Sequence, residues 1–246
     1  MRYLIVMLIG LCLSACAERD LFYQASMPYI PVLPKEGSLE VDLLAATPGA
    51  VSLQAGYRAK GHIVLGLNAQ QIIGPEQVLE RFLHRNRFFE YGQGLTWRVK
   101  GGMMSLLGWA GRGVFSEAHE ETDRWNLSFT KAKLQWGYGM RYKDLELKLG
   151  YHLGRVHYDF ARVDVVKSDI VNEIRDLQRK PTQWFHGVAV NGGIGLESCY
   201  VGMYLTYEDP FSSFEATYSL FSPIQMGVGI SLMLQTKRQK APEKEP

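Results

Sequence analysis

The sequence predicts an all-β protein, an antiparallel up-and-down β-barrel of ten or twelve strands, and three observations support this prediction. Apolar residues alternate with small or polar ones along eleven runs, which is the two-residue period of a β-strand. Very short connections between the runs alternate with mostly long ones, as in a meandering barrel whose two rims differ. The chain also holds 25 Gly and 12% aromatic residues, a composition typical of strands that bend around a small barrel.

The runs and their connections follow one another from residue 38. The runs span 38–46, 51–59, 63–70, 88–100, 103–115, 125–142, 145–158, 184–196, 199–207, 213–221 and 224–235. Very short connections lie at 60–61, 101–102, 143–144, 197–198 and 222–223, and longer ones at 71–87, 116–124, 159–183 and 208–212. Single-chain membrane barrels usually have an even number of strands, so one of the eleven runs is split, merged or missed.

Two of the long connections show the spacing of a helix. In 71–87, Pro75 stands at a first helical position, and apolar residues follow at three- and four-residue spacing at Val78, Leu79, Phe82 and Leu83. In 159–183, Ser168 is a candidate N-cap for an apolar stripe formed by Ile170, Val171, Ile174 and Leu177. We therefore expect a short helix in each of these two loops, both leaving from the same rim.

The first sixteen residues resemble a bacterial lipoprotein signal. Arg2 is a short basic region, residues 4–13 are apolar, and Leu13-Ser14-Ala15 directly precedes Cys16. An ordinary signal peptide or a short membrane anchor is the alternative, but the apolar stretch is too short to span a bilayer comfortably. We therefore expect residues 1–15 to be removed and Cys16 to carry the lipid, palmitate among its acyl groups.

The rest of the chain divides into three parts. Residues 16–36 read as a tether and lead-in, 37–236 as the β-barrel domain and 237–246 as a charged tail. The formal net charge of +2 offers no strongly basic patch, so we expect no nucleic-acid partner. Cys199 is the one thiol left after removal of the signal and acylation of Cys16, so no disulfide is expected within one chain.

Alternation alone leaves open whether the apolar faces contact lipid or a protein core. The polar faces carry charges of both signs beside many Gly, a mixture that destabilises a water-exposed strand but suits a crowded lumen. The predicted luminal charges are Glu40, Asp42, Arg58, Glu90, Arg98, Lys131, Lys133, Arg141, Glu146 and Lys148. We favour a membrane barrel with a plugged, charge-paired lumen. The alternative is a soluble, acyl-tethered, lipocalin-like barrel that binds an apolar ligand.

The last run, IQMGVGISLMLQ (224–235), matches the C-terminal signal that the bacterial barrel-assembly machinery reads. That signal is a polar residue, any residue, Gly, two of any kind, an apolar residue, any residue and an apolar residue. The matching residues are Gln225, Gly227, Ile230 and Leu232. The chain departs from the pattern after the strand, because a charged tail follows where such chains usually stop on an aromatic residue.

Two stretches, YIPVLPKEGSLEV (29–41) and LQAGYRAKGHIVLGLNA (53–69), resemble a known family. The matching positions are Tyr29, Pro31, Gly37, Leu53, Gln54, Tyr57 and His62. On these positions the mature chain is similar to the small outer-membrane β-barrel-type lipoproteins of the Bacteroidota, a largely uncharacterised family. The resemblance weakens after about residue 70. It implies a lipid-anchored barrel of the bacterial outer membrane and brings no known activity.

No motif in the sequence predicts catalysis, a metal site or a cofactor, so we assign no such residues and expect no cofactor. Ser116, His119, His157 and His186 lie near a predicted rim, which keeps a rim-active lipid-modifying hydrolase as a less favoured alternative. We predict a lipid-anchored outer-membrane protein with a structural or surface-interaction role. It contacts membrane lipid through Cys16 and the barrel exterior, and the sequence does not identify its surface partner.

Overall fold

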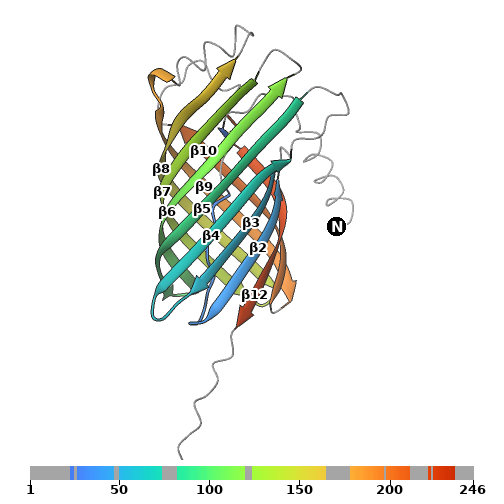
Figure 1. Ribbon diagram of the computed structural model, residues 1–246. Helices are drawn as coiled ribbons and strands as arrows, with labels where there is room; N and C mark the ends of the chain where they lie inside the picture. The colour runs from blue at the N-terminus through green and yellow to red at the C-terminus, as the bar shows by residue number, and fades with distance from the viewer. Residues whose placement is uncertain are drawn as a thin grey trace, which may run out of the picture.

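A computed structural model of the chain describes residues 23–24, 27–46, 50–73, 82–119, 124–164, 178–196, 198–210, 221–222 and 224–235. Ten strands among these residues close into one antiparallel barrel, in the order β10-β12-β2-β3-β4-β5-β6-β7-β8-β9 (Figure 1). Each strand pairs with the next barrel strand along the chain, and the last pairs with the first. This is the predicted up-and-down topology, and closure removes the free edges of the sheet.

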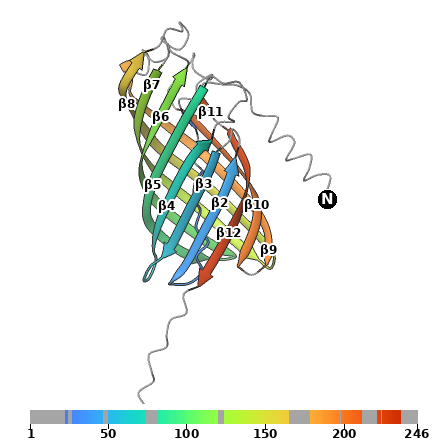
Figure 2. The same cartoon turned by 45° about the vertical axis from the view of Figure 1, so that its right-hand side comes forward.

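The barrel strands lengthen from β2 to β8 and shorten again toward the end of the chain. They are β2 (Ser38–Ala46), β3 (Ala50–Arg58), β4 (Ile63–Ile73), β5 (Phe82–Val99), β6 (Gly102–His119), β7 (Arg124–Tyr142), β8 (Leu145–Asp164), β9 (Thr182–Leu196), β10 (Cys199–Pro210) and β12 (Ile224–Gln235). Two short strands do not belong to the barrel sheet: β1 (Tyr23–Gln24) and β11 (Phe221–Ser222, labelled in Figure 2) pair in parallel with each other.

The connections define two rims. The short-turn rim holds the connections 59–62, 100–101, 143–144 and 197–198, together with the start of β2 and the end of β12. The long-loop rim holds 47–49, 74–81, 120–123, 165–181 and 211–223. The rims therefore differ in the way that the alternation of connection lengths predicts.

The predicted strand at 213–221 is not a strand of the barrel. β10 continues to Pro210 and pairs directly with β12, with Cys199 opposite Leu232 and Tyr207 opposite Ile224. Of this run only Phe221 is described, and it belongs to β11. The predicted short connection at 222–223 is therefore wrong, because the whole of 211–223 joins β10 to β12. Removing this run gives the even strand number of ten.

The helix predicted for 71–87 is wrong where the structure describes that segment. β4 continues to Ile73, and Phe82 and Leu83 already lie in β5, opposite His119 and Ala118 of β6. Strand pairing satisfies the backbone N–H and C=O groups of these residues, and this outweighs the helical spacing of a few apolar side chains. The stripe predicted in the second loop (170–177) lies outside the described residues.

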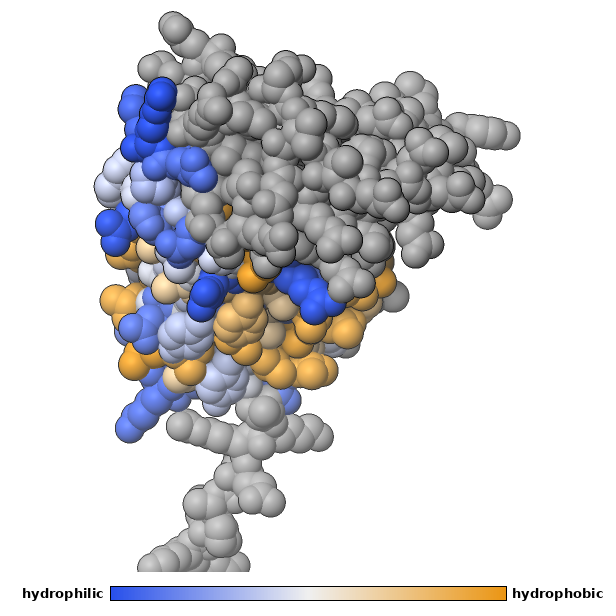
Figure 3. Space-filling model, turned by 45° about the horizontal axis from the view of Figure 1, so that its top comes forward, coloured by the Kyte–Doolittle hydropathy of each residue, from blue (hydrophilic) through white to orange (hydrophobic). Residues whose placement is uncertain are grey.

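The apolar side chains face outward along the strands, and the polar ones face inward. On β12, Ile224, Val228 and Ile230 are between 44% and 49% exposed, whereas Gln225 is fully buried. The same inversion runs around the barrel, and apolar residues gather over the outer wall (Figure 3). The soluble lipocalin-like alternative is wrong, because it requires the alternating aliphatic side chains to face an internal core.

Residues 27–36 run through the inside of the barrel. Met27 packs against Leu44 and Tyr204 near the long-loop rim, and its carbonyl oxygen accepts a hydrogen bond from Gln54. At the other end of the segment, Glu36 accepts a hydrogen bond from the Gly61 N–H, at the short-turn rim. Residues 27–36 of the predicted tether and lead-in (16–36) therefore cross the lumen before β2 begins. We call residues 27–36 the luminal segment.

Glycines of the wall make room for the luminal segment. A Cβ atom at Gly56 would lie 2.0 Å from the hydroxyl oxygen of Tyr29, and one at Gly139 would lie 2.4 Å from Cγ2 of Val32. Both positions tolerate no larger side chain unless the segment moves. This confirms the expectation that Gly on the polar strand faces borders a crowded interior.

Candidate functional site: the luminal charge networks

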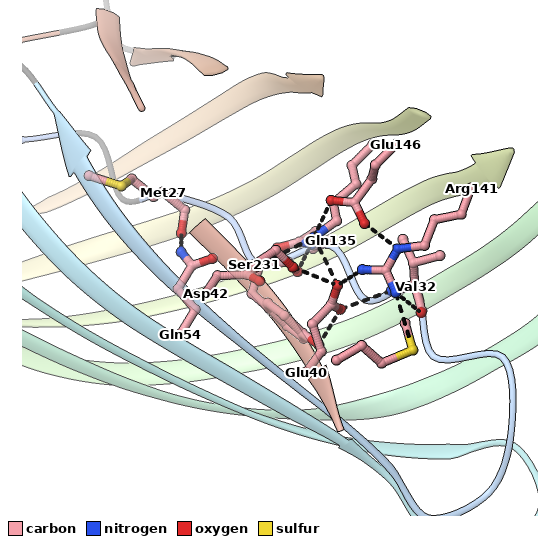
Figure 4. Close-up of polar contacts among 12 residues, drawn as sticks. Met27, Val32, Glu40, Asp42, Gln54, Gln135, Arg141, Glu146 and Ser231 are labelled. Atoms are coloured by element: carbon pink, nitrogen blue, oxygen red, sulfur yellow. Dashed lines mark hydrogen bonds and ion pairs between the residues drawn. The ribbon is translucent and has the colours of Figure 1, made fainter. Parts of the chain in front are cut away.

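A network of buried ionic side chains spans the lumen near the short-turn rim, and Glu40 of β2 lies at its centre (Figure 4). Arg141 of β7 contacts the carboxylate of Glu40, and Lys148 Nζ of β8 lies 3.0 Å from Glu40 Oε1. Because β2 and β7 are five strands apart in a ring of ten, this contact joins opposite walls. We call Glu40, Asp42, Arg141, Glu146 and Lys148 the Glu40 network.

The other two acids of the Glu40 network surround the same cations. Arg141 also pairs with Glu146, and Lys148 Nζ lies 3.2 Å from Glu146 and 3.4 Å from Asp42. Glu40, Asp42, Glu146 and Lys148 are each less than 5% exposed. Removing such charges from water is costly, and the mutual pairing of three acids with two bases is what compensates that cost.

The luminal segment completes the hydrogen bonds of this network. The hydroxyl group of Tyr29 donates to Glu40 Oε2 over 2.8 Å, and the backbone N–H of Val32 donates to the same oxygen over 3.1 Å. On the opposite wall, Gln135 Nε2 donates to the carbonyl oxygen of Tyr29 over 2.6 Å. The segment is therefore bonded to both sides of the lumen through its backbone and its side chains.

A second group of buried charges lies closer to the long-loop rim. Glu208 of β10 accepts from Lys131 Nζ at 3.2 Å and contacts His152 Nε2 at 2.8 Å. Lys133 Nζ lies 2.9 Å from Glu90 Oε2, which also accepts from Asn68 over 3.0 Å. We call Glu208, Lys131 and His152 the Glu208 network.

Aromatic rings border the two lysines of this region. Lys131 Nζ lies 4.3 Å from the ring centroid of Phe185, and Lys133 Nζ lies 5.4 Å from that of Trp109. Each ammonium group therefore has a carboxylate partner and a ring face, the combination that lowers the cost of burying a lysine.

Eight of the ten predicted luminal charges take part in these buried ion pairs. Arg58 is half-buried and donates to the carbonyl oxygens of Leu33 and Gly61. These two bonds tie it to the luminal segment and to a turn, and neither involves a carboxylate. Arg98 occupies the inward register of β5, but it lies at the short-turn end and is exposed. Neighbouring strands end there, so water reaches its guanidinium group.

Two residues that matter in the lumen were not assigned to it from the sequence. Glu208 was placed in a connection, although it continues the inward positions Tyr204 and Thr206 of β10. Tyr29 was placed in a tether, because a segment that is surrounded on all sides shows no two-residue period. The signal that remained was indirect: an apolar YIPVL stretch together with many inward Gly.

The rim histidines whose side chains are described, His157 and His186, have separate partners. His157 and His186 both face outward on neighbouring strands; His157 contacts Thr182 at 2.8 Å, and His186 lies 3.9 Å from Asp209. The side chains of Ser116 and His119 lie outside the described residues. Where side chains are described, no three His, Cys, Asp or Glu residues come together as a possible metal site. Across the same described residues, no helix is long and apolar enough to cross a membrane.

The residues of the predicted assembly signal lie on both faces of β12. Gln225 and Gly227 face the lumen, where a Cβ at Gly227 would lie 2.4 Å from the Tyr204 hydroxyl, and Ile230 and Leu232 face outward. A closed antiparallel barrel with short turns at one rim, an apolar outer wall and a polar interior is the pattern of bacterial membrane barrels. The fold is that of an outer-membrane β-barrel.

Comparisons with known proteins give the chain neither a family nor an activity. No family model and no curated protein matches the chain. Among solved structures, the outer membrane protease OmpT from Escherichia coli is 10% identical with a TM-score of 0.49, covering 80% of this chain and 93% of that one. The outer membrane enzyme PagL is 6% identical with a TM-score of 0.34, covering 81% and 99%. These identities are too low to transfer an activity.

Proposed function

We propose that the protein is a lipid-anchored β-barrel of the bacterial outer membrane whose lumen is closed by its own luminal segment. Its role is structural or one of surface interaction, and the long loops are the natural surface for a partner. The observation that carries this proposal is the crossing of the lumen by residues 27–36, bonded to Glu40 and to Gln135 on opposite walls.

The small size of the cavities beside Asp42 supports a closed lumen. Two cavities among the described residues adjoin Asp42, and the luminal segment lines the second; they measure about 10 and 20 Å³, enough for about one water molecule each. An eight-stranded barrel is filled by its own side chains, whereas wide porins leave a channel. A ten-stranded barrel has a slightly wider lumen that its own side chains do not fill, and here the luminal segment fills the remaining space.

Replacing residues 29–33 by Gly and Ser is expected to open a narrow ion path through the barrel. The change removes the Tyr29 ring and the Ile30 and Val32 side chains from the lumen but keeps the chain length. The measurement is single-channel recording in planar bilayers, in which the unchanged protein gives no conductance steps and the variant does. A conducting unchanged protein, or a silent variant that still shows the heat-modifiable gel mobility of a folded barrel, contradicts the proposal.

Placing Arg on the outer wall is expected to destabilise the barrel according to depth. Leu149→Arg, a few residues inside β8, should lower the free energy of unfolding by about 2–4 kcal/mol, because a charged group there faces the hydrocarbon. Leu145→Arg, on the same face at the short-turn rim, is the matched control and should cost about 0–1 kcal/mol. Urea titration in lipid vesicles measures both, and equal costs would argue against a membrane around this wall.

Acylation at Cys16 is tested on the mature protein from membranes. Cys16 lies outside the described residues, so the proposal rests on the sequence LSAC. Mass spectrometry should find a diacylglycerol-modified, acylated Cys16 as the first residue. Cys16→Ser should remove the lipid yet leave the barrel in the membrane fraction after carbonate washing, because the strands themselves span the bilayer. An unmodified N-terminal peptide that retains Cys16 contradicts acylation without affecting the barrel.

A further inference from the structure

Arginines on the outer wall are confined to one side of the barrel among the described residues. Arg87 of β5, Arg112 of β6 and Arg155 of β8 are exposed and alternate with inward residues, so they face outward. The described outward positions of β2, β3, β4 and β12 carry no charged side chain along the strand interiors. Charges facing lipid are costly at mid-depth. β2 and β3 end before the depth of these arginines, which therefore lie on the longer strands β5, β6 and β8.

A groove lies beside these arginines, on the outer wall between β5 and β9. Strand register places Tyr91, Ala110, Ala132, Arg155 and Trp184 side by side across five consecutive strands. The small residues in the middle form a floor, and larger ones stand on either side. The resulting groove has a volume of about 570 Å³.

The next row toward the short-turn rim continues the groove as an apolar surface. There Gly108 extends the floor, and Leu134 and Leu153 follow it on β7 and β8. The row on the other side, toward the long-loop rim, is polar and includes Arg112, Thr130 and His157. The end of the groove nearer the short-turn rim is thus apolar, and the end nearer the long-loop rim is basic.

The basic end lies at the depth of the lipid headgroups on the long-loop side. Arg112 and Arg155 are each ten residues into their strands from the short-turn rim. At about 3.3 Å per residue and a tilt of about 40°, this rise is about 25 Å, the height of the apolar band of such barrels. The guanidinium groups therefore reach the layer in which lipid phosphates lie.

We propose that this groove binds a phosphate-bearing membrane lipid of the leaflet on the long-loop side. Arg112 and Arg155 bind the phosphate, and an acyl chain lies on the floor of Gly108, Ala110 and Ala132 between Tyr91 and Leu134. Guanidinium groups suit phosphate oxygens because they donate paired, charge-assisted hydrogen bonds. The nearest described carboxylate on this face of β8, Asp159, lies 3.6 Å from His157. This inference rests on the proposed placement in the outer membrane.

The test is a titration of detergent-solubilised protein with dioleoyl phosphatidic acid, with bound lipid counted by native mass spectrometry. The unchanged protein should retain one molecule in preference to phosphatidylcholine with the same chains. The double variant R112Q/R155Q should weaken binding at least about tenfold, because it removes two charge-assisted contacts to the phosphate. Ala132→Leu, which fills the floor without changing charge, should also weaken it.

Arg98→Gln is the matched control, since Arg98 is an exposed arginine at the opposite rim. It should leave phosphatidic acid binding unchanged. Equal weakening by R98Q, no effect of either groove variant, or displacement of the lipid by millimolar inorganic phosphate would each overturn the proposal. Heat-modifiable mobility of every variant separates these results from a failure of the barrel itself.

Discussion

Glu40→Ala should lower the free energy of unfolding of the barrel by about 3–5 kcal/mol, because it breaks two buried ion pairs and leaves two buried hydrogen-bond donors without their acceptor. The substitution leaves the cations of Arg141 and Lys148 facing the remaining acids alone, and it strips the acceptor from the Tyr29 hydroxyl and the Val32 N–H. The midpoint of urea unfolding in detergent, followed by tryptophan fluorescence, measures the loss.

Two further variants make this result specific. Glu40→Gln keeps an oxygen acceptor but not the charge, so it should fall between the unchanged protein and Glu40→Ala. Asp144→Asn removes an exposed acid in the turn between β7 and β8 and should change the free energy of unfolding by no more than about 0.5 kcal/mol. If Glu40→Ala unfolds at the same urea concentration as Asp144→Asn, the network does not stabilise the fold.

Breaking the Glu208 network from either side should be costly, whereas removing Lys131 and Glu208 together should cost less than the two losses added. Lys131→Met leaves Glu208 with His152 as its remaining partner in that network, and Glu208→Leu leaves the buried ammonium of Lys131 without its carboxylate. We expect about 3–5 kcal/mol for each single variant. The double variant should cost clearly less than the two single losses added, since an apolar pair of similar volume often replaces a buried ion pair without loss. What then remains is the loss of the Glu208 carboxylate beside His152 Nε2.

This double-mutant cycle separates charge pairing from packing. Additive losses, with the double variant near the sum of the singles, would show that Lys131 and Glu208 act independently. In that case the ring of Phe185 beside Lys131, and not the carboxylate, would be the interaction that matters.

The alternation of each strand was readable from the sequence because the two faces of a barrel wall meet different surroundings. The ranges 38–46 and 224–235 coincide with β2 and β12, and the inward face of the charges follows from the same period. The outward direction of the apolar face followed from the inward Gly, which the structure explains by the passage of the luminal segment at Gly56 and Gly139.

The pairing within the lumen was not readable, because it depends on how far each strand is shifted against its neighbours. Glu40 and Arg141 are 101 residues apart, and their contact crosses the barrel instead of joining adjacent strands. The prediction of a barrel strand at 213–221 was wrong for a related reason: an alternating pattern fits a strand, but only closure of β12 onto both β10 and β2 shows that no place remains for it.

The luminal segment also determines the rim at which each end of the chain leaves the barrel. An even number of strands returns to its starting rim, and Ser38 indeed pairs with Gln235. The segment adds one more passage, so that Tyr23 and Gln24 pair with β11 at the long-loop rim. The proposed acyl group on Cys16, at most about 25 Å of extended chain from Tyr23, would then enter the leaflet on that side. Because residues 27–36 cross the lumen ahead of β2, the chain enters the barrel at the long-loop rim, whereas its last barrel strand ends at the short-turn rim.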